Sequence, residues 1–159
     1  MQLTQHRLPF KLKKILRKWS AEEFPFLIFV PSIGLLTLAL AAVRAILPTE
    51  KHGAAVFSTD PQRIEKVQSM RTGQLNYLIT TTILERGVTF SKLNVVILGA
   101  DEKTFSVSAL VQIAGRVGRS KVRPSGEVIF ICADRTKNVQ AALKQIHNMN
   151  RKGRDLLHG

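Results

Sequence analysis

Apolar residues in this chain gather into short, nearly continuous runs separated by longer segments of mixed polarity. Runs of this length that are rich in β-branched and aromatic residues predict strands. Because polar residues do not alternate with the apolar ones, both faces of each strand are expected to be covered. The predicted strands are Phe26–Val30, Ala54–Ser58, Leu75–Thr80, Asn94–Leu98 and Glu127–Cys132.

Helices are predicted between these strands. At the start of one helix, Asp60 can accept free backbone N–H groups and Pro61 suits the first helical position, and Gly73 suits its end. The alternation of strands and helices predicts an α/β fold, with an open, mostly parallel sheet flanked by helices on both faces. The predicted helices are Leu35–Leu47, Pro61 to about Arg71, Val107–Arg119 and Thr136–Asn150.

The segment between Glu23 and Arg44 has no charged residue and is long enough to span a membrane. Pro31-Ser32-Ile33-Gly34 predicts a turn in its middle, with a strand before it and a helix after it. No intrinsic membrane span is therefore expected, and a membrane-anchored protein that uses residues 24–43 as a span is kept as an alternative.

The chain carries 24 Lys and Arg against 11 Asp and Glu, a net charge of +13, which attracts polyanions. Charge alone does not separate DNA, RNA and anionic lipid. Six of these cations lie within residues 1–20, where no acid occurs and apolar residues alternate with the bases. This segment is interpreted as an arm or linker outside the core.

Few residues suggest metal or disulfide chemistry. Cys132 is the only cysteine and lies in an apolar run, and the four histidines show no paired spacing. Val95–Glu102 imitates the strand and acidic pair of a Walker B motif, but the chain has no Gly-x-x-x-x-Gly-Lys-[Ser/Thr] loop to accompany it. No metal site is predicted.

The most informative stretch is Gln112–Arg119. On a helix, Gln112, Arg116 and Arg119 share one face, because they are four and three residues apart. Gly115 and Gly118 each cost about 1 kcal/mol relative to alanine inside a helix. Such glycines beside two arginines indicate close approach of another surface or of phosphate groups.

This stretch has the form Gln-x-x-Gly-Arg-x-Gly-Arg, which resembles motif VI of superfamily-two helicases. Other motifs of that superfamily have counterparts in the expected order. Phe29–Ser32 resembles motif IV, and Leu78–Phe90 resembles motif V. The segment between them has counterparts in Val56–Asp60, Arg63 and Met70–Gly73.

The amino-acid sequence of these motifs resembles that of the ComFA family of late competence proteins over about residues 24–150. It includes Thr-Thr-Thr-Ile-Leu-Glu-Arg-Gly-Val-Thr-Phe, Leu-Gly-Ala-Asp and Leu-Val-Gln-Ile-Ala-Gly-Arg-Val-Gly-Arg. The primosomal helicases of replication restart share parts of motifs V and VI and match Ile83–Phe90 less well.

The resemblance implies a second RecA-like domain, of the P-loop NTPase type, at residues 24–159. Residues 1–23 would be a basic linker from a first motor domain that is absent from this chain. That first domain would hold ATP with Mg²⁺, and none is expected to bind stably to this chain. Arg116 and Arg119 would reach the γ-phosphate, with Gln112 as a supporting contact.

Motifs IV and V add further implied contacts. Gly87 marks a loop near the nucleotide, and Thr89 stands where many relatives have an aspartate bonded to the ribose, which puts that ribose contact in doubt. Two alternatives stay open: Ser32 as a helix cap, and the threonines at 80–82 as an ordinary strand end. The residues implied to contact the nucleic-acid backbone are Ser32, Arg63, Thr81 and Thr82.

The expected function is that of the C-terminal motor domain of an ATP-dependent DNA translocase that takes up single-stranded DNA during transformation. Alone, the chain is expected to be inactive as an ATPase. The implied partners are single-stranded DNA, the first RecA-like domain and other DNA-uptake proteins at a membrane channel. A cytoplasmic location, at the inner face of the cell membrane, follows from these partners. The alternatives are a basic nucleic-acid-binding module without a motor role and a helicase of the primosomal type.

Overall fold

The computed structural model describes residues 8–81, 93–114, 127–132 and 136–158, with side chains to residue 147. Its five strands are β1 (Phe26–Phe29), β2 (Gly53–Val56), β3 (Tyr77–Thr80), β4 (Asn94–Leu98) and β5 (Val128–Ile131). A 3₁₀ turn, η2 (Ile33–Leu35), follows β1. The α-helices are α1 (Phe10–Ala21), α2 (Leu36–Ile46), α3 (Arg63–Arg71), α4 (Val107–Ala114) and α5 (Lys137–His158).

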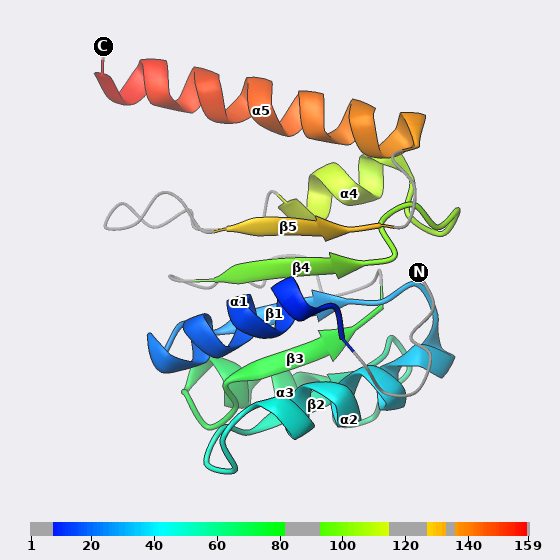
Figure 1. Cartoon of the computed structure of the whole chain (residues 1–159), viewed down its shortest axis with the longest axis vertical. Helices are drawn as coiled ribbons and strands as arrows, with labels where there is room; N and C mark the ends of the chain where they lie inside the picture. The colour runs from blue at the N-terminus through cyan, green and yellow to red at the C-terminus, as the bar shows by residue number, and fades with distance from the viewer. Residues whose placement is uncertain (1–7, 82–92, 115–126, 133–135, 159) are drawn as a thin grey trace.

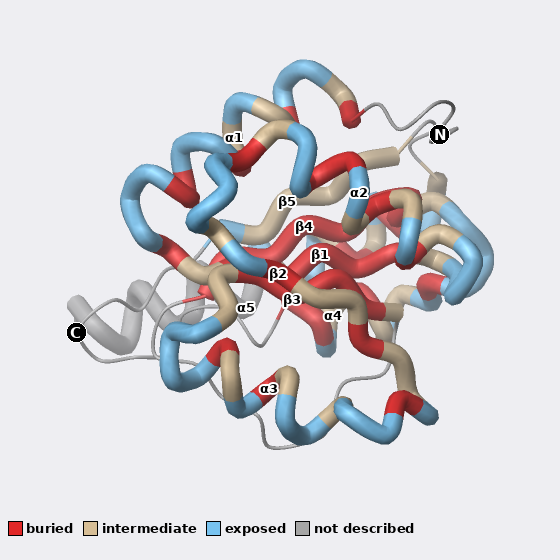
Figure 2. The backbone as a smooth tube through the Cα atoms, turned by 90° about the horizontal axis from the view of Figure 1, so that it is seen from below, coloured by how far each residue is buried: buried red, intermediate tan, exposed pale blue. Residues whose placement is uncertain are grey.

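The strands form one sheet in the order β2-β3-β1-β4-β5, and all of its pairings are parallel (Figure 1). The two faces of the sheet carry separate apolar clusters. Helices α1 and α2 cover one face, while α3, α4 and α5 cover the other. Figure 2 shows the buried strands between these two layers of helices. The predicted open parallel sheet with helices on both faces is confirmed.

The core follows from the pleat of the strands, because successive side chains point to opposite faces. In β1, Phe26 and Ile28 face α1 and α2, whereas Leu27 and Phe29 face the helices of the other layer. All four are at most 1% exposed. The continuous apolar runs in the sequence are thus explained by burial on both sides.

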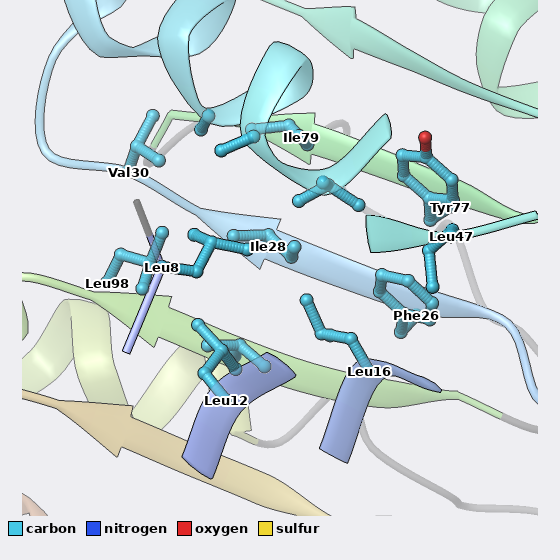
Figure 3. Packing of buried hydrophobic residues seen from close by; sticks show 14 of the residues in the cluster. Leu8, Leu12, Leu16, Phe26, Ile28, Val30, Leu47, Tyr77, Ile79 and Leu98 are labelled. Atoms are coloured by element: carbon cyan, nitrogen blue, oxygen red, sulfur yellow. The ribbon is translucent and has the colours of Figure 1, made fainter. Parts of the chain in front are cut away.

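Helix α1 corrects one prediction. Its Leu12, Leu16 and Trp19 are at most 1% exposed and belong to the same cluster as Phe26 (Figure 3). The interpretation of residues 1–20 as a segment outside the core is therefore wrong for the described residues from Leu8 onward. Apolar positions four and three residues apart form one face of a helix, and the bases between them lie on the other. The origin of residues 1–23 in a first motor domain stays a prediction.

The uncharged segment after Glu23 is divided as predicted. It forms β1, the turn with η2, and the 11-residue helix α2. Within the described parts of the chain, no helix has both the length and the apolar character needed to cross a membrane.

Some element ends differ from the predictions. Helix α3 begins at Arg63 rather than Pro61, because the Asp60 carboxylate accepts the N–H of Gln62 at 2.9 Å in a turn before the helix. The predicted acceptance of a backbone N–H by Asp60 is confirmed. Helix α5 continues to His158, beyond the predicted end at Asn150. Helix α4 is described to Ala114, and the rest of the predicted helix lies outside the described residues.

Candidate nucleic-acid and nucleotide interface

The carboxyl ends of the five parallel strands meet at one edge of the sheet, where open α/β folds place their ligands. Strand β1 leads to α2 on one face, and its neighbour β4 leads to α4 on the opposite face. The turns after these two strands touch each other. A Cβ on Gly99, which has φ +66°, would lie 3.3 Å from the Pro31 side chain. This edge is the topological switch point of the sheet.

Ser32 and Thr81 follow neighbouring strands at this edge. The Val30 N–H donates to the Thr80 carbonyl at 2.8 Å, which extends the pairing of β1 with β3 up to these two residues. Ser32 is exposed and precedes η2, but its hydroxyl makes no capping hydrogen bond. The alternative role of this side chain as a helix cap is therefore not realised.

The threonines at the end of β3 differ in exposure. Thr80 is fully buried, and its Oγ1 has no hydrogen-bond partner among the described residues. Thr81 is half-buried and is the first of the run to reach the surface. The strand-end interpretation fits Thr80, whereas Thr81 lies where it can contact a ligand. Thr82 lies outside the described residues.

Arg63 begins α3, just beyond the end of β2 on the far side of β3. Its Nη1 donates to the Ser58 carbonyl at 2.7 Å, which ties the side chain to the turn after the strand. Ser32, Thr81 and Arg63 thus follow three adjacent strands of the sheet. Of the predicted nucleic-acid contacts, these three are brought to one edge.

An ion pair at the start of α3, which the sequence did not predict, lies beside Arg63. Lys66 Nζ lies 2.7 Å from Asp60 Oδ2 and also donates to the Ala55 carbonyl at 3.0 Å. The Asp60 side chain is 4% exposed. The hydrogen bond from Lys66 holds the pKa of Asp60 below its ordinary value, although burial opposes this. The signal available in the sequence was an acid before the helix and a lysine six residues later.

Of the five residues predicted to contact the nucleotide, Gln112 lies within the described part of the chain. It is exposed on α4, whose Leu110 and Ile113 are buried in the cluster with the sheet and α5. The helix starts with the Ser106 hydroxyl accepting the N–H of Ala109 at 3.1 Å. The polar stripe of Gln112, Arg116 and Arg119 stays a prediction. The other four predicted nucleotide contacts lie outside the described residues: Gly87, Thr89, Arg116 and Arg119.

The residues at this edge can be compared with what ATP and Mg²⁺ require. The turn after β1 holds Pro31 and an exposed Ile33 where a phosphate-binding loop would place glycines and a lysine. Among the described residues, no three His, Cys, Asp or Glu side chains are grouped as metal ligands.

The chain resembles known proteins along most of its length. The family described as helicase conserved C-terminal domain matches residues 9–121. The competence protein ComFA of Bacillus subtilis (strain 168) is 42% identical over 149 residues, which are 94% of this chain and 32% of that protein. The competence protein ComFA of Streptococcus pneumoniae (strain ATCC BAA-255 / R6) is 39% identical over 150 residues, which are 94% of this chain and 34% of that protein. The chain thus spans about a third of the length of these relatives.

A solved structure shares the fold. The crystal structure of the DUF1998 helicase MrfA bound to DNA superposes with a TM-score of 0.64 and 20% identity, covering 88% of this chain and 19% of that one. Together with the parallel sheet, this likeness confirms the predicted RecA-like fold.

Proposed function

Because the chain belongs to the helicase conserved C-terminal domain family and matches the C-terminal helicase domain of ComFA, we propose that it is the second lobe of an ATP-driven DNA translocase. In this role it contacts single-stranded DNA and completes an ATP site whose other half lies in a first RecA-like lobe.

The proposed binding of single-stranded DNA is supported by the positions of Ser32, Thr81 and Arg63, which follow three adjacent strands. Two hydroxyls and one guanidinium can donate to consecutive phosphates of a strand that crosses this edge. Thr82 is proposed as a further backbone contact. Because these donors contact the backbone and no base edge, the proposed binding is independent of sequence.

The proposed completion of the ATP site depends on Gln112 and on two arginines that follow it in the sequence, Arg116 and Arg119. The first lobe would hold ATP with Mg²⁺, and the ATP would supply the γ-phosphoryl group that is transferred to water. Arg116 and Arg119 present planar, permanently charged guanidinium groups to the γ-phosphate oxygens. Gln112 supports them from the preceding turn, while Gly87 and Thr89 line the nucleotide.

The proposed biological setting is supported by the relatives, both of which are named competence proteins. The complete protein would use ATP to draw single-stranded DNA into the cell during transformation. Its partners would be the first motor lobe and the DNA-uptake proteins of a membrane channel, which places it at the cytoplasmic face of the cell membrane.

The test uses a protein in which this chain follows its first motor lobe. Arg119→Ala should lower DNA-stimulated ATP hydrolysis about 10³-fold or more, because an arginine finger contributes that much to the rate. Affinity for single-stranded DNA should be nearly unchanged. The matched control is Lys144→Ala, which removes an exposed cation from α5 and should leave both activities intact.

A second candidate, favoured by the net charge of +13, is a nucleic-acid-binding module without a motor role. It predicts that Arg119→Ala leaves ATP hydrolysis intact. The proposal would also fail if this chain alone hydrolysed ATP at the rate of a complete motor.

A further inference from the structure

The outer face of helix α1 is a row of cations with one aromatic ring at its start. Its five exposed large side chains all lie on the side that turns away from the sheet. No acidic residue occurs between Phe10 and Ala21. These side chains, here called the α1 basic face, are Phe10, Lys11, Lys14, Arg17 and Lys18.

The fold holds this face rigidly. The opposite side of α1 is packed into the core, and two hydrogen bonds fix the last turns of the helix. Arg17 Nε donates to the Ile46 carbonyl of α2 at 3.2 Å, and Trp19 Nε1 donates to Glu127 Oε2 at 3.3 Å, just before β5. A rigid row of cations binds a polyanion with less loss of conformational entropy than a flexible basic tail does.

The charges of the α1 basic face are not neutralised within the described part of the chain. The ion pair between Lys66 and Asp60 lies beside α3, which covers the opposite face of the sheet. Lys14 lies three residues after Lys11 and four before Lys18, and like charges at these spacings repel one another on a helix. An external polyanion would relieve this repulsion and release its own counterions.

Phe10 bears on which class of polyanion would fit this face. Its ring is 68% exposed, and Lys14 Nζ lies 4.9 Å from the ring centroid. An exposed aromatic ring beside ammonium groups is the combination that single-stranded nucleic acids use, because a base stacks on the ring while phosphates meet the cations. A lipid surface fits less well, because the apolar face of α1 is already buried against the sheet.

The position of α1 connects this face to the carboxyl edge. Leu8, just before the helix, packs near Leu98 and Val30 at the carboxyl ends of their strands (Figure 3). At the other end of the helix, the Trp19 ring packs on Phe26 at the start of β1. The helix therefore runs antiparallel to the strands, and Phe10 lies at its end nearest to Ser32.

We propose that the α1 basic face is a second binding surface for single-stranded nucleic acid, continuing from the carboxyl edge along the outside of the domain. The base next to the edge stacks on Phe10, and the following phosphates meet Lys11, Lys14 and Lys18. This surface is separate from the proposed nucleotide contacts, so it does not depend on a motor role for Arg116 and Arg119.

The test measures binding of fluorescein-labelled oligothymidylate to the full chain by anisotropy over a range of salt concentrations. The triple variant Lys11→Ala, Lys14→Ala, Lys18→Ala should bind about tenfold or more weakly in 0.1 M salt, with the slope of log K against log salt reduced by about 2. The control triple Lys51→Ala, Lys137→Ala, Lys144→Ala changes the net charge equally and should nearly preserve both affinity and slope. Phe10→Ala should cost about tenfold in affinity with the slope unchanged.

Equal losses from both triple variants would mean that only the net charge matters, and the proposal would be overturned. It would also be overturned if Phe10→Ala bound normally. A third contrary result is an α1 variant that keeps oligothymidylate binding but loses binding to vesicles of equal parts phosphatidylcholine and phosphatidylserine. Trp19 fluorescence checks folding, and Lys18→Glu alone should weaken binding in the same direction if the triple variant folds poorly.

Discussion

The ring of Tyr77 in β3 occupies the space in which residue 53 of the neighbouring strand β2 would carry a side chain. Residue 53 is glycine, and a Cβ there would overlap the Cδ2, Cε2 and Cζ atoms of the ring. The two residues are register partners, and Phe26 is the partner of Tyr77 on its other side. Phe26 and Tyr77 stack with ring centroids 5.2 Å apart, so the tyrosine ring has no room to move away.

Gly53→Ala should therefore destabilise the domain. Overpacking of a filled core costs about 1–3 kcal/mol, and the stacked partner prevents easy relief. Urea unfolding followed by circular dichroism measures the loss. The control is Gly34→Ala, at a position where an added Cβ meets nothing within 4 Å and where little change is expected. If both variants had the same stability, the Tyr77 ring would not be fixed over residue 53.

Trp19 provides a test of whether α1 is part of the core. The side chain is 1% exposed, tilted against Phe26 and hydrogen-bonded to Glu127. Trp19→Ala should lower the free energy of unfolding by about 3–5 kcal/mol, as deletion of a buried aromatic does. Phe10→Ala, on the exposed side of the same helix, should change it by no more than about 0.5 kcal/mol.

The same residue reports on cooperativity, because Trp19 is the only tryptophan of the chain. In the parent protein, its fluorescence and the far-ultraviolet circular dichroism should change over the same range of urea concentration. A fluorescence change at clearly lower urea would show that α1 leaves the sheet separately, and would contradict its assignment to the core.

The strands were predictable because a parallel sheet buries each strand on both faces and so requires continuous apolar runs such as Phe26–Phe29. Their order in the sheet was not predictable in the same way. The pairing of β1 with both β3 and β4 depends on how long the crossovers are and which face they cover, and neither is encoded within a strand. Helix α1 was misjudged because its abundant lysines obscured the apolar stripe formed by Leu12, Leu16 and Trp19.

The candidate site was predictable only in part for a similar reason. Motif resemblance singled out Ser32 and Thr81 one at a time, but their adjacency comes from the pairing of two strands that are far apart in the sequence. The Asp60–Lys66 pair escaped notice because it depends on the burial of Asp60, which is a property of the fold. The arrangement of Arg116 and Arg119 stays a prediction.

The Asp60–Lys66 pair predicts a specific pH dependence. The folded-state pKa of Asp60 is lowered from 3.8, so the pair stabilises the fold fully above that pH, and its contribution declines as the pH falls below it. Lys66→Met removes the charged partner and leaves the Asp60 carboxylate with the Gln62 N–H, which should cost about 2 kcal/mol near pH 7. The cost should shrink as the pH falls below 3.8 and through the lowered pKa of Asp60, because protonation of Asp60 then removes the pair from the parent protein as well.

Urea unfolding of the two proteins at a series of pH values measures this difference. The control is the double variant Asp60→Asn, Lys66→Met, which has no carboxylate to leave unpaired and should be more stable than Lys66→Met alone at pH 7. A cost of Lys66→Met that did not depend on pH would assign the effect to lost packing of the lysine stem instead of to the charge.

The adjacent threonines at the end of β3 offer the sharpest test of the carboxyl edge, because one substitution serves as the control for the other. Thr81→Val keeps the shape of a half-buried side chain but removes its hydroxyl, and should weaken binding of single-stranded DNA about tenfold, as expected for a lost hydrogen bond to a charged phosphate.

Thr80→Val removes a buried hydroxyl that has no partner among the described residues, so it should leave DNA affinity unchanged and raise stability by up to about 1 kcal/mol. Anisotropy with a labelled oligonucleotide gives the affinities, and urea unfolding gives the stabilities. If Thr80→Val reduced DNA affinity as much as Thr81→Val did, the loss would arise from the shape of the strand end, and Thr81 would have no direct contact with the phosphate backbone.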